Sequence, residues 1–491
     1  MQGELKIYNT YTRSLEVFKP IKAPFVGLYV CGPTVYGAPH LGHARGPITF
    51  DIVHRYLLHL GYRVRYVRNI TDVGHLVGDA DEGEDKIAKK ARLEQLEPME
   101  IAQLYTNSYH NEIGKLNVLP PSIEPLASGH IPEQIEMVQK ILELGLAYES
   151  NGSVYFDVNK YAQNHDYGKL SGRILDDLIA GAGNESRQLE GQDEKRNSAD
   201  FALWKKASPE HIMRWNSPWG EGFPGWHLEC SVMSTKYLGQ EFDIHGGGMD
   251  LLFPHHESEI AQSTTCNHVH PARVWMHHNM ITVNGQKMAK SLNNGINLSD
   301  LFTGENHLLE KAYSPMTMKF FVQQAHYRGT IDFSNEALQA AEKGLARLFN
   351  AYKLVDGLKT SAASTSNIQK LIDACYSDMN EDFNTPKVIA TLFEGARIAN
   401  SVNDGKETLT AEDKTLLKTL FDTFLIEILG LQEEEKGNEA LVNDLMQLII
   451  TLRKDARDKK DFATSDIIRD RLKEAGVQLK DGKEGTTFSV E

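Results

Sequence analysis

The stretch from Tyr29 to His43, Tyr-Val-Cys-Gly-Pro-Thr-Val-Tyr-Gly-Ala-Pro-His-Leu-Gly-His, constrains the fold of this chain most strongly. An apolar run from Phe25 to Val30 precedes its glycines and prolines, and apolar residues at helical spacing follow through Leu60. The pattern predicts a strand, a turn and the start of a helix. In open α/β sheets, ligands bind beyond the carboxyl ends of the strands, where free N–H groups of helix N-termini meet anions. We therefore expect a ligand site at this junction.

A second strand is expected directly after the helix. Helical spacing of apolar residues runs from Pro47 to Leu60, Gly61 is a stop signal, and Arg63 to Asn69 has a strand-like pattern. A strand, a crossover helix and a second strand form a βαβ unit, in which the two strands are parallel. The segment Asn69-Ile-Thr-Asp72 is then expected beside the first junction in space.

Length and charge limit the classes of protein to which the chain can belong. Its 491 residues suggest roughly three domains. The net charge of −15 argues against binding nucleic acid over the whole surface, because such binding needs lysine and arginine to neutralise phosphates. A local basic patch remains compatible with this charge. Between Thr451 and Lys483 there are ten Lys or Arg and seven Asp or Glu, a modest basic excess that also fits a solvated charged helix.

The cysteine count and the hydropathy pattern favour a reducing compartment. The four cysteines, at positions 31, 230, 266 and 375, are too few and too scattered for a disulfide framework. Reduced thiols and metal ligands are the better expectation. No apolar run is long enough to span a bilayer, and Met1 to Pro20 has no signal-peptide core. We expect a cytoplasmic protein without a membrane partner.

Four residues far apart in the sequence have side chains that zinc accepts as ligands, namely Cys31, Cys230, His255 and Glu259. His255 and Glu259 are four positions apart and share one face of an expected helix. No regular zinc-finger spacing joins the four. Buried cysteines and a helix-capping histidine are the commoner explanation of this spacing, because free cysteine is among the most buried residue types.

Two short motifs suit phosphate groups. His40-Leu-Gly-His43 places two potential cations at a helix N-terminus, where imidazole donors stabilise charge on a phosphoryl centre, and Gly42 leaves room for a nucleotide. Lys287-Met-Ala-Lys-Ser291, after an expected Asn284-Gly285 hairpin turn, is a compact loop cluster suited to pyrophosphate. Each motif alone also fits an ordinary turn or surface. A third segment, Gly246-Gly-Gly248, allows a ligand to approach the backbone closely.

The combination of these motifs resembles the class I aminoacyl-tRNA synthetases, whose signatures are written HIGH and KMSKS. Further segments look like the cysteinyl-tRNA synthetase family in particular. They are Tyr29-Val-Cys-Gly-Pro-Thr-Val-Tyr36, Gly225-Trp-His-Leu-Glu-Cys230, Phe242-Asp-Ile-His-Gly-Gly-Gly248, Phe253-Pro-His-His-Glu-Ser-Glu259 and His326-Tyr-Arg328. These motifs span most of the chain in the expected order, so chance does not explain the match.

The resemblance implies a set of site residues. It implies one zinc ion per chain, held by the four candidate ligands Cys31, Cys230, His255 and Glu259. It implies catalytic roles for His40, His43, Lys287 and Lys290. ATP-binding roles fall on Gly42, Asp250, Lys290 and Ser291, with Asp250 near the ribose. Contacts to the amino acid fall on Thr71, Trp226 and His245.

The resemblance also implies a reaction and its partners. L-Cysteine reacts with ATP, accompanied by Mg²⁺, to give an adenylate, and cysteine is then transferred to its tRNA. A soft thiolate binds zinc far better than a hydroxyl or methyl group does, so selection of cysteine by zinc reaches about 10⁴-fold without a separate editing domain. We expect a monomer.

The implied fold is an α/β Rossmann-like catalytic domain with an inserted subdomain, a helical bundle and a small C-terminal domain. We expect the two catalytic halves at 1–125 and 222–275, and the inserted connective subdomain at 126–221. The lysine-loop connecting domain is expected at 276–334 and the bundle at 335–432. Residues 438–491 would be the tRNA- and anticodon-binding domain.

Two departures from the family pattern and two competing functions remain. Ala289 replaces the usual serine of the lysine loop, and Phe488 stands where the family often has tryptophan, which weakens the case for base stacking there.

A ligase that joins cysteine to an amino sugar is the nearest alternative, suggested by the acidic run 78–85. The long helical region after Asn335 argues against that ligase. A non-catalytic zinc or RNA-binding module is opposed by the intact histidine and lysine signatures.

Overall fold

A computed structural model of the chain describes residues 3–76, 85–175, 194–209, 211–289, 292–434, 439–482 and 485–490. The chain divides into two compact units, Met1–Gln432 and Glu433–Glu491. Within the described part, no helix combines the length and the apolar character needed to cross a membrane. Residues Lys290 and Ser291, and all but the last residue of the acidic run 78–85, lie outside the described residues.

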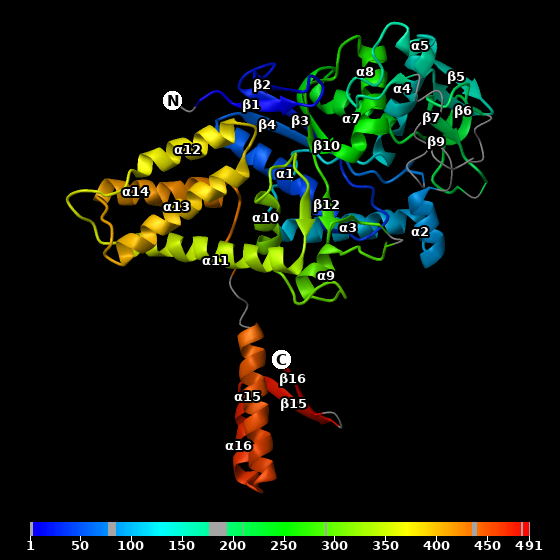
Figure 1. Cartoon of the computed structure of the whole chain (residues 1–491). Helices are drawn as coiled ribbons and strands as arrows, with labels where there is room; N and C mark the ends of the chain where they lie inside the picture. The colour runs from blue at the N-terminus through cyan, green and yellow to red at the C-terminus, as the bar shows by residue number, and fades with distance from the viewer. Residues whose placement is uncertain are drawn as a thin grey trace. The chain divides into compact units, whose positions relative to one another are not determined.

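A four-stranded parallel sheet forms the centre of the first unit (Figure 1). Its strands β3 (Phe25–Val30), β4 (Arg63–Arg68), β10 (Phe242–Gly248) and β11 (Ala272–His278) lie in the order β11-β10-β3-β4. Helix α1 (Leu41–His59) connects β3 to β4, so the predicted parallel βαβ unit is confirmed. The chain order reverses direction between β3 and β10, and ligands of open sheets bind at such a switch point.

Helix α1 begins at Leu41, so His40 and His43 lie at a helix N-terminus as predicted, although the clear apolar spacing starts only at Pro47. The His40 side chain accepts a hydrogen bond from the Gly42 N–H, and the His43 side chain accepts one from the His40 N–H. These two bonds form a capping box with imidazoles in place of the usual hydroxyl and carboxylate. Histidine caps are uncommon, so the capping geometry itself was not part of the sequence prediction.

A separate antiparallel sheet stands between β4 and β10 in the sequence. Its order is β5-β6-β7-β9-β8. The strands are β5 (Ala147–Ser150), β6 (Ser153–Phe156), β7 (Phe201–Lys206), β8 (Trp215–Ser217) and β9 (Gly220–Pro224). Apolar side chains of this sheet pack with those of helix α4 (Ile131–Glu143) in a core of their own. The chain therefore leaves the parallel sheet, builds a second core and returns.

Several short elements complete the first unit. They are β1 (Lys6–Asn9), β2 (Ser14–Val17), α2 (Lys86–Glu94), α3 (Pro98–Lys115), α5 (Val158–Ala162), α7 (Leu228–Leu238), α8 (Glu257–Asn267), β12 (Ile281–Val283), β13 (Gln286–Lys287), α9 (Leu298–Thr303), α10 (Pro315–Gln323) and β14 (Ile331–Phe333). Strands β12 and β13 pair antiparallel across Asn284 and Gly285, whose φ angles are 50° and 76°. The predicted hairpin turn is thus confirmed, because this turn type needs positive φ at both positions.

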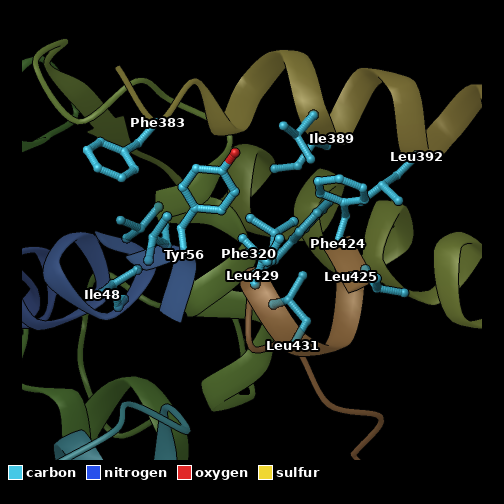
Figure 2. Packing of buried hydrophobic residues seen from close by; sticks show 14 of the residues in the cluster. Ile48, Tyr56, Phe320, Phe383, Ile389, Leu392, Phe424, Leu425, Leu429 and Leu431 are labelled. Carbon is cyan, nitrogen blue, oxygen red and sulfur yellow. The ribbon is translucent and has the colours of Figure 1, made fainter. Parts of the chain in front are cut away.

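The helical bundle shares a hydrophobic core with helix α1 of the parallel-sheet domain. The bundle comprises α11 (Asn335–Gly357), α12 (Ile368–Asn380), α13 (Thr385–Asn403), α14 (Ala411–Leu420) and a wide helical turn, Phe421–Ile428. Figure 2 shows Tyr56 of α1 among Phe320 of α10, Ile389 of α13 and Phe424. The Tyr56 hydroxyl donates a hydrogen bond to Asn380 Oδ1 (2.8 Å). The bundle is therefore packed onto the parallel-sheet domain rather than tethered to it.

A buried ion pair ties α1 to α10 beneath this core. Lys319 Nζ lies 2.8 Å from Asp51 Oδ2, and both side chains are fully buried. Arg55 donates to the same Asp51 oxygen (2.8 Å). Lys319 and Arg55 each donate to the carbonyl of Asn117, and the Asn117 amide donates to the carbonyl of Gly430. The network thus joins α1, α10 and the end of the bundle.

The second unit is a helical pair followed by a β-hairpin. It consists of α15 (Glu439–Asp458), α16 (Phe462–Glu474), β15 (Val477–Gly482) and β16 (Gly485–Val490). The two helices match the sequence prediction. The hairpin, in which Leu479 pairs with Phe488, replaces the short tail that the sequence suggested.

Replacing Asp51 with Asn should destabilise the first unit, because Lys319 keeps a buried charge and loses its carboxylate. Removing one partner of a buried pair costs about 3–5 kcal/mol. Urea unfolding followed by tryptophan fluorescence measures the loss. The control is Glu394→Gln, which breaks an exposed pair with Arg397 and should have little effect. Equal stability of the two variants would contradict the prediction.

Candidate metal centre and nucleotide site

The four predicted metal ligands converge from four separate elements. Cys31 follows β3, Cys230 lies in the first turn of α7, His255 lies just before α8, and Glu259 lies within α8. One ligand atom from each lies within 4.8 Å of all the others. Cys31 Sγ is 3.6 Å from Cys230 Sγ, and His255 Nε2 is 3.4 Å from Cys230 Sγ and 3.3 Å from Glu259 Oε1. The sequence segments are far apart, but the side chains form one cluster.

The chemistry of the cluster fits a zinc ion. Burial raises the pKa of the Cys230 thiol to about 12, and burial together with neighbouring Cys230 holds the pKa of Cys31 well above its usual value. A cation among these groups would favour the thiolates, because metal binding displaces the thiol protons. Two thiolates, an imidazole and a carboxylate are accepted zinc ligands. Cys31 is only half-buried, so the cluster is reachable from one side.

A second set of potential ligands overlaps the first. It replaces Cys230 and His255 by His245 and His256 and keeps Cys31 and Glu259. His256 Nε2 lies 3.3 Å from Cys31 Sγ, and His245 Nε2 lies 2.8 Å from Glu259 Oε2. The sequence motifs did not single out His256, although its position three residues before Glu259 places it on the same side of a helix. His245, which the resemblance placed near the amino acid, contacts the carboxylate of the cluster.

Three consecutive glycines of β10 allow protein side chains to pack on its backbone. A Cβ at Gly246 would lie 2.3 Å from the Phe50 ring, and one at Gly247 would lie 2.6 Å from the His256 ring. A Cβ at Gly248 would lie 2.3 Å from Asp250 Oδ1. The space that the sequence assigned to a ligand is therefore filled by these side chains. Asp250 itself is exposed at the carboxyl end of β10.

The predicted histidine pair stands at the start of α1 with its rings stacked, 3.8 Å between centroids. Nδ1 of each ring accepts a backbone hydrogen bond, so Nε2 of each neutral ring carries the proton and can donate. Burial, with His40 nearby, lowers the pKa of His43 to about 3. His43 is therefore a neutral donor at physiological pH and not the cation that the sequence suggested.

The lysine loop contacts the start of α1. A Cβ at Gly42 would lie 3.2 Å from Met288 Cε, so the glycine leaves room for this loop. Asn294 ties the loop together, because it accepts from the Ala289 N–H (2.8 Å) and donates to the carbonyl of Lys287 (3.1 Å). Lys287 is exposed at the end of β13. The structure brings Met288 of this loop to the start of α1, whereas Lys290 and Ser291 lie outside the described residues.

Thr71 and Trp226 lie beside the metal cluster with partners that the sequence did not predict. Thr71 donates to Glu229 Oε1 (2.5 Å), and burial raises the pKa of this carboxyl well above its usual range. The Trp226 ring stacks on His75 (3.9 Å between centroids) and is tilted on His255 (4.4 Å). The sequence analysis did not predict a role for Glu229. The only signal that could have indicated one is its position directly before the candidate ligand Cys230.

A chain of hydrogen bonds fixes the orientation of His75. Lys86 Nζ donates to His75 Nε2 (2.7 Å), because an ammonium group cannot accept. The other ring nitrogen, Nδ1, lies 2.5 Å from Thr34 Oγ1 and is then the donor. Thr34 stands between Cys31 and the histidine pair in the junction between β3 and α1. His75 thus supports two walls of the same site.

Comparisons with known proteins agree with this geometry. Residues 17–343 match the family described as tRNA synthetases class I (C) catalytic domain, and residues 374–433 match the DALR domain. Solved structures with a similar fold include a methionyl-tRNA synthetase of Mycobacterium tuberculosis, at 13% identity and a TM-score of 0.56, with 84% of this chain and 90% of that chain covered. A putative arginyl-tRNA synthetase of Campylobacter jejuni has a TM-score of 0.51 at 14% identity, with 85% and 94% covered.

Curated relatives match over their full length. The cysteine–tRNA ligase of Porphyromonas gingivalis is 60% identical, with 100% of both chains covered. That of Cytophaga hutchinsonii is 58% identical, with 99% of both covered. These identities confirm the resemblance found in the sequence motifs. The chain belongs to the cysteine–tRNA ligase family of the class I aminoacyl-tRNA synthetases.

Proposed function

We propose that this chain carries out ATP-dependent ligation of L-cysteine to its tRNA at the switch point between β3 and β10. The observation that carries the proposal is the convergence of Cys31, Cys230, His255 and Glu259 within 4.8 Å at the junction that also holds the histidine pair. Only nine positions separate Cys31 from His40. A thiol held at the metal cluster would thus place the carboxylate of cysteine near a phosphate held by α1.

In this proposal the metal cluster selects cysteine over other amino acids. One zinc ion per chain, held by Cys31, Cys230, His255 and Glu259, would supply an open position for the substrate thiolate, which serine and alanine cannot match. His245 holds the second oxygen of Glu259, so that Oε1 faces His255 and Cys31. Such supporting hydrogen bonds fix the orientation of metal ligands.

The reaction needs positioning and charge stabilisation rather than a covalent enzyme intermediate. The cysteine carboxylate attacks the α-phosphorus of ATP, a P–O bond forms, and the bond to pyrophosphate breaks. The Nε2–H groups of His40 and His43 donate to phosphate oxygens, and Lys287 adds positive charge. The terminal ribose hydroxyl of tRNA then attacks the carbonyl carbon, and AMP leaves.

The remaining assignments follow the family pattern. Lys290 and Ser291 would bind phosphate with Mg²⁺, Gly42 and Asp250 would face the nucleotide, and Thr71, Trp226 and His245 would surround the amino acid. A cytoplasmic monomer whose region 438–491 contributes to tRNA binding completes the proposal. Full-length similarity to cysteine–tRNA ligases, including the helical region, disfavours the amino-sugar ligase.

Replacing Cys230 with Ser should lower the zinc content and raise the KM for cysteine. A hydroxyl is a poor zinc ligand, so the loss in affinity should be at least the roughly 10–100-fold that changes in residues supporting metal ligands typically cause. Zinc quantification and pyrophosphate exchange measure the two effects. Cys375→Ser is the matched control, because this buried cysteine lies in α12. Unchanged zinc in the Cys230 variant would remove this residue from the ligand set.

A chain ending at Gln432 should keep pyrophosphate exchange and lose efficiency in tRNA charging. The first unit is compact by itself, so the exchange site remains intact. The measurement compares the KM for tRNA of the shortened and full-length proteins. Equal charging by both would remove the tRNA role from the second unit. If the full-length protein exchanges pyrophosphate but never charges tRNA, the ligation proposal itself fails.

A further inference from the structure

A cavity of about 320 Å³ lies outside the site described above. One wall is the turn between β1 and β2, which contributes Arg13, and the other is the loop after α5, which contributes Lys169 and Arg173. All three side chains are exposed to solvent. Asp166 is the one acidic residue among the lining residues. Three cations and one anion leave the cavity with an excess of two positive charges, in a chain whose net charge is −15.

Within the described part of the chain, none of these three cations forms an ion pair with a carboxylate. Two of them rest on aromatic rings instead. Lys169 Nζ lies 4.6 Å from the centroid of the Tyr11 ring, and the Arg173 guanidinium lies 4.3 Å from that of Phe253. Aromatic rings hold a cation in place without neutralising it. The charges are therefore positioned and still available to an anion.

The backbone of the loop is adapted to Arg13. A Cβ at Gly172 would clash with the Arg13 guanidinium, and Gly172 has a φ of +74°. A side chain at position 172 would thus push Arg13 out of the cavity and strain the loop. The glycine allows Arg13 and Arg173 to face the same space from opposite walls.

Both walls of the cavity are attached to elements that carry the metal cluster. The Ser171 N–H donates to Glu257 Oε2 (3.0 Å), two residues from His255 in the sequence. On the other wall, Thr10 hydrogen-bonds to His277, which in turn contacts His256 (2.7 Å). Phe253, beneath Arg173, is also two residues from His255. An anion in this cavity would therefore approach the active site from its outer edge.

We propose that this cavity binds backbone phosphates of the single-stranded 3′ end of tRNA as it enters the active site. The proposal rests on tRNA being the second substrate. A positively charged groove is the usual device for following the backbone of single-stranded nucleic acid, and here the rings of Tyr11 and Phe253 hold two of its cations in place. The phosphates of ATP have their own donors at His40, His43 and Lys287, so the cavity suits the other polyanionic substrate.

The test replaces Arg13, Lys169 and Arg173 with Gln, singly and together. The KM for tRNA should rise several-fold for each change, while pyrophosphate exchange stays at the wild-type level. The slope of log affinity against log salt should fall by about 0.7 for each phosphate that the variant no longer binds. The separate variant Arg13→Lys keeps the positive charge and should therefore keep most of the wild-type affinity for tRNA. The control is Lys140→Gln, an exposed cation of α4 that does not line the cavity.

A second arm locates the bound phosphates on the tRNA. With tRNA that lacks its last four nucleotides, the wild type and the triple variant should bind equally, because the phosphates in question are gone. A difference that persists with this shortened tRNA would overturn the assignment to the 3′ end. Loss of pyrophosphate exchange in the triple variant would overturn it too, because the cavity would then serve ATP or folding. If all variants charge tRNA like the wild type, the proposal for this cavity is wrong, but the proposed ligation of cysteine to tRNA still holds.

Discussion

The parallel pairing of β3 with β10 is the contact on which the rest of the structure depends. The two strands are far apart in the sequence, yet Ile244 pairs with Leu28 and the Cys31 N–H donates to the carbonyl of Gly246 (3.1 Å). This register sets Cys31 beside the helices that precede and follow β10. Those helices, α7 and α8, supply Cys230 and Glu259. A slip of this pairing would separate the metal ligands and the histidine pair at once.

Burial favours the neutral form of several polar groups around the metal cluster and the start of α1. Burial lowers the pKa of His43 and His256 and raises the pKa of both cluster cysteines and of Glu229. Each of these groups has a hydrogen-bond partner: Cys31 contacts Cys230 and His256, His43 accepts from the His40 N–H, and Glu229 accepts from Thr71, which offsets part of the cost of burying them. Lys287, by contrast, is exposed at the end of β13. On the proposed assignment, the thiol would be selected in the buried part of the site and phosphate would be bound at the exposed edge.

The regular parts of the fold could be predicted from the sequence because they follow simple periodicities. The βαβ unit and the Asn284-Gly285 hairpin were predicted from apolar spacing and turn residues. The hairpin β15–β16 was not, because a short terminal hairpin has a weak local signal. The metal cluster could be assembled only through the family resemblance, since four ligands from four elements share no period. His75, Glu229 and His256 were missed because buried polar residues near a site have the same sequence appearance as structural ones.

The three glycines of β10 have a consequence for how this chain can vary. Each one makes room for a different partner: Phe50 from α1, His256 from the turn before α8, and Asp250 from the turn that follows β10. A larger residue at Gly246 or Gly247 would need a compensating change in a different element, and a different one for each. At Gly248 the exposed Asp250 side chain can move aside. Substitution in this segment is therefore restricted mainly at its first two glycines, whatever ligand the site binds.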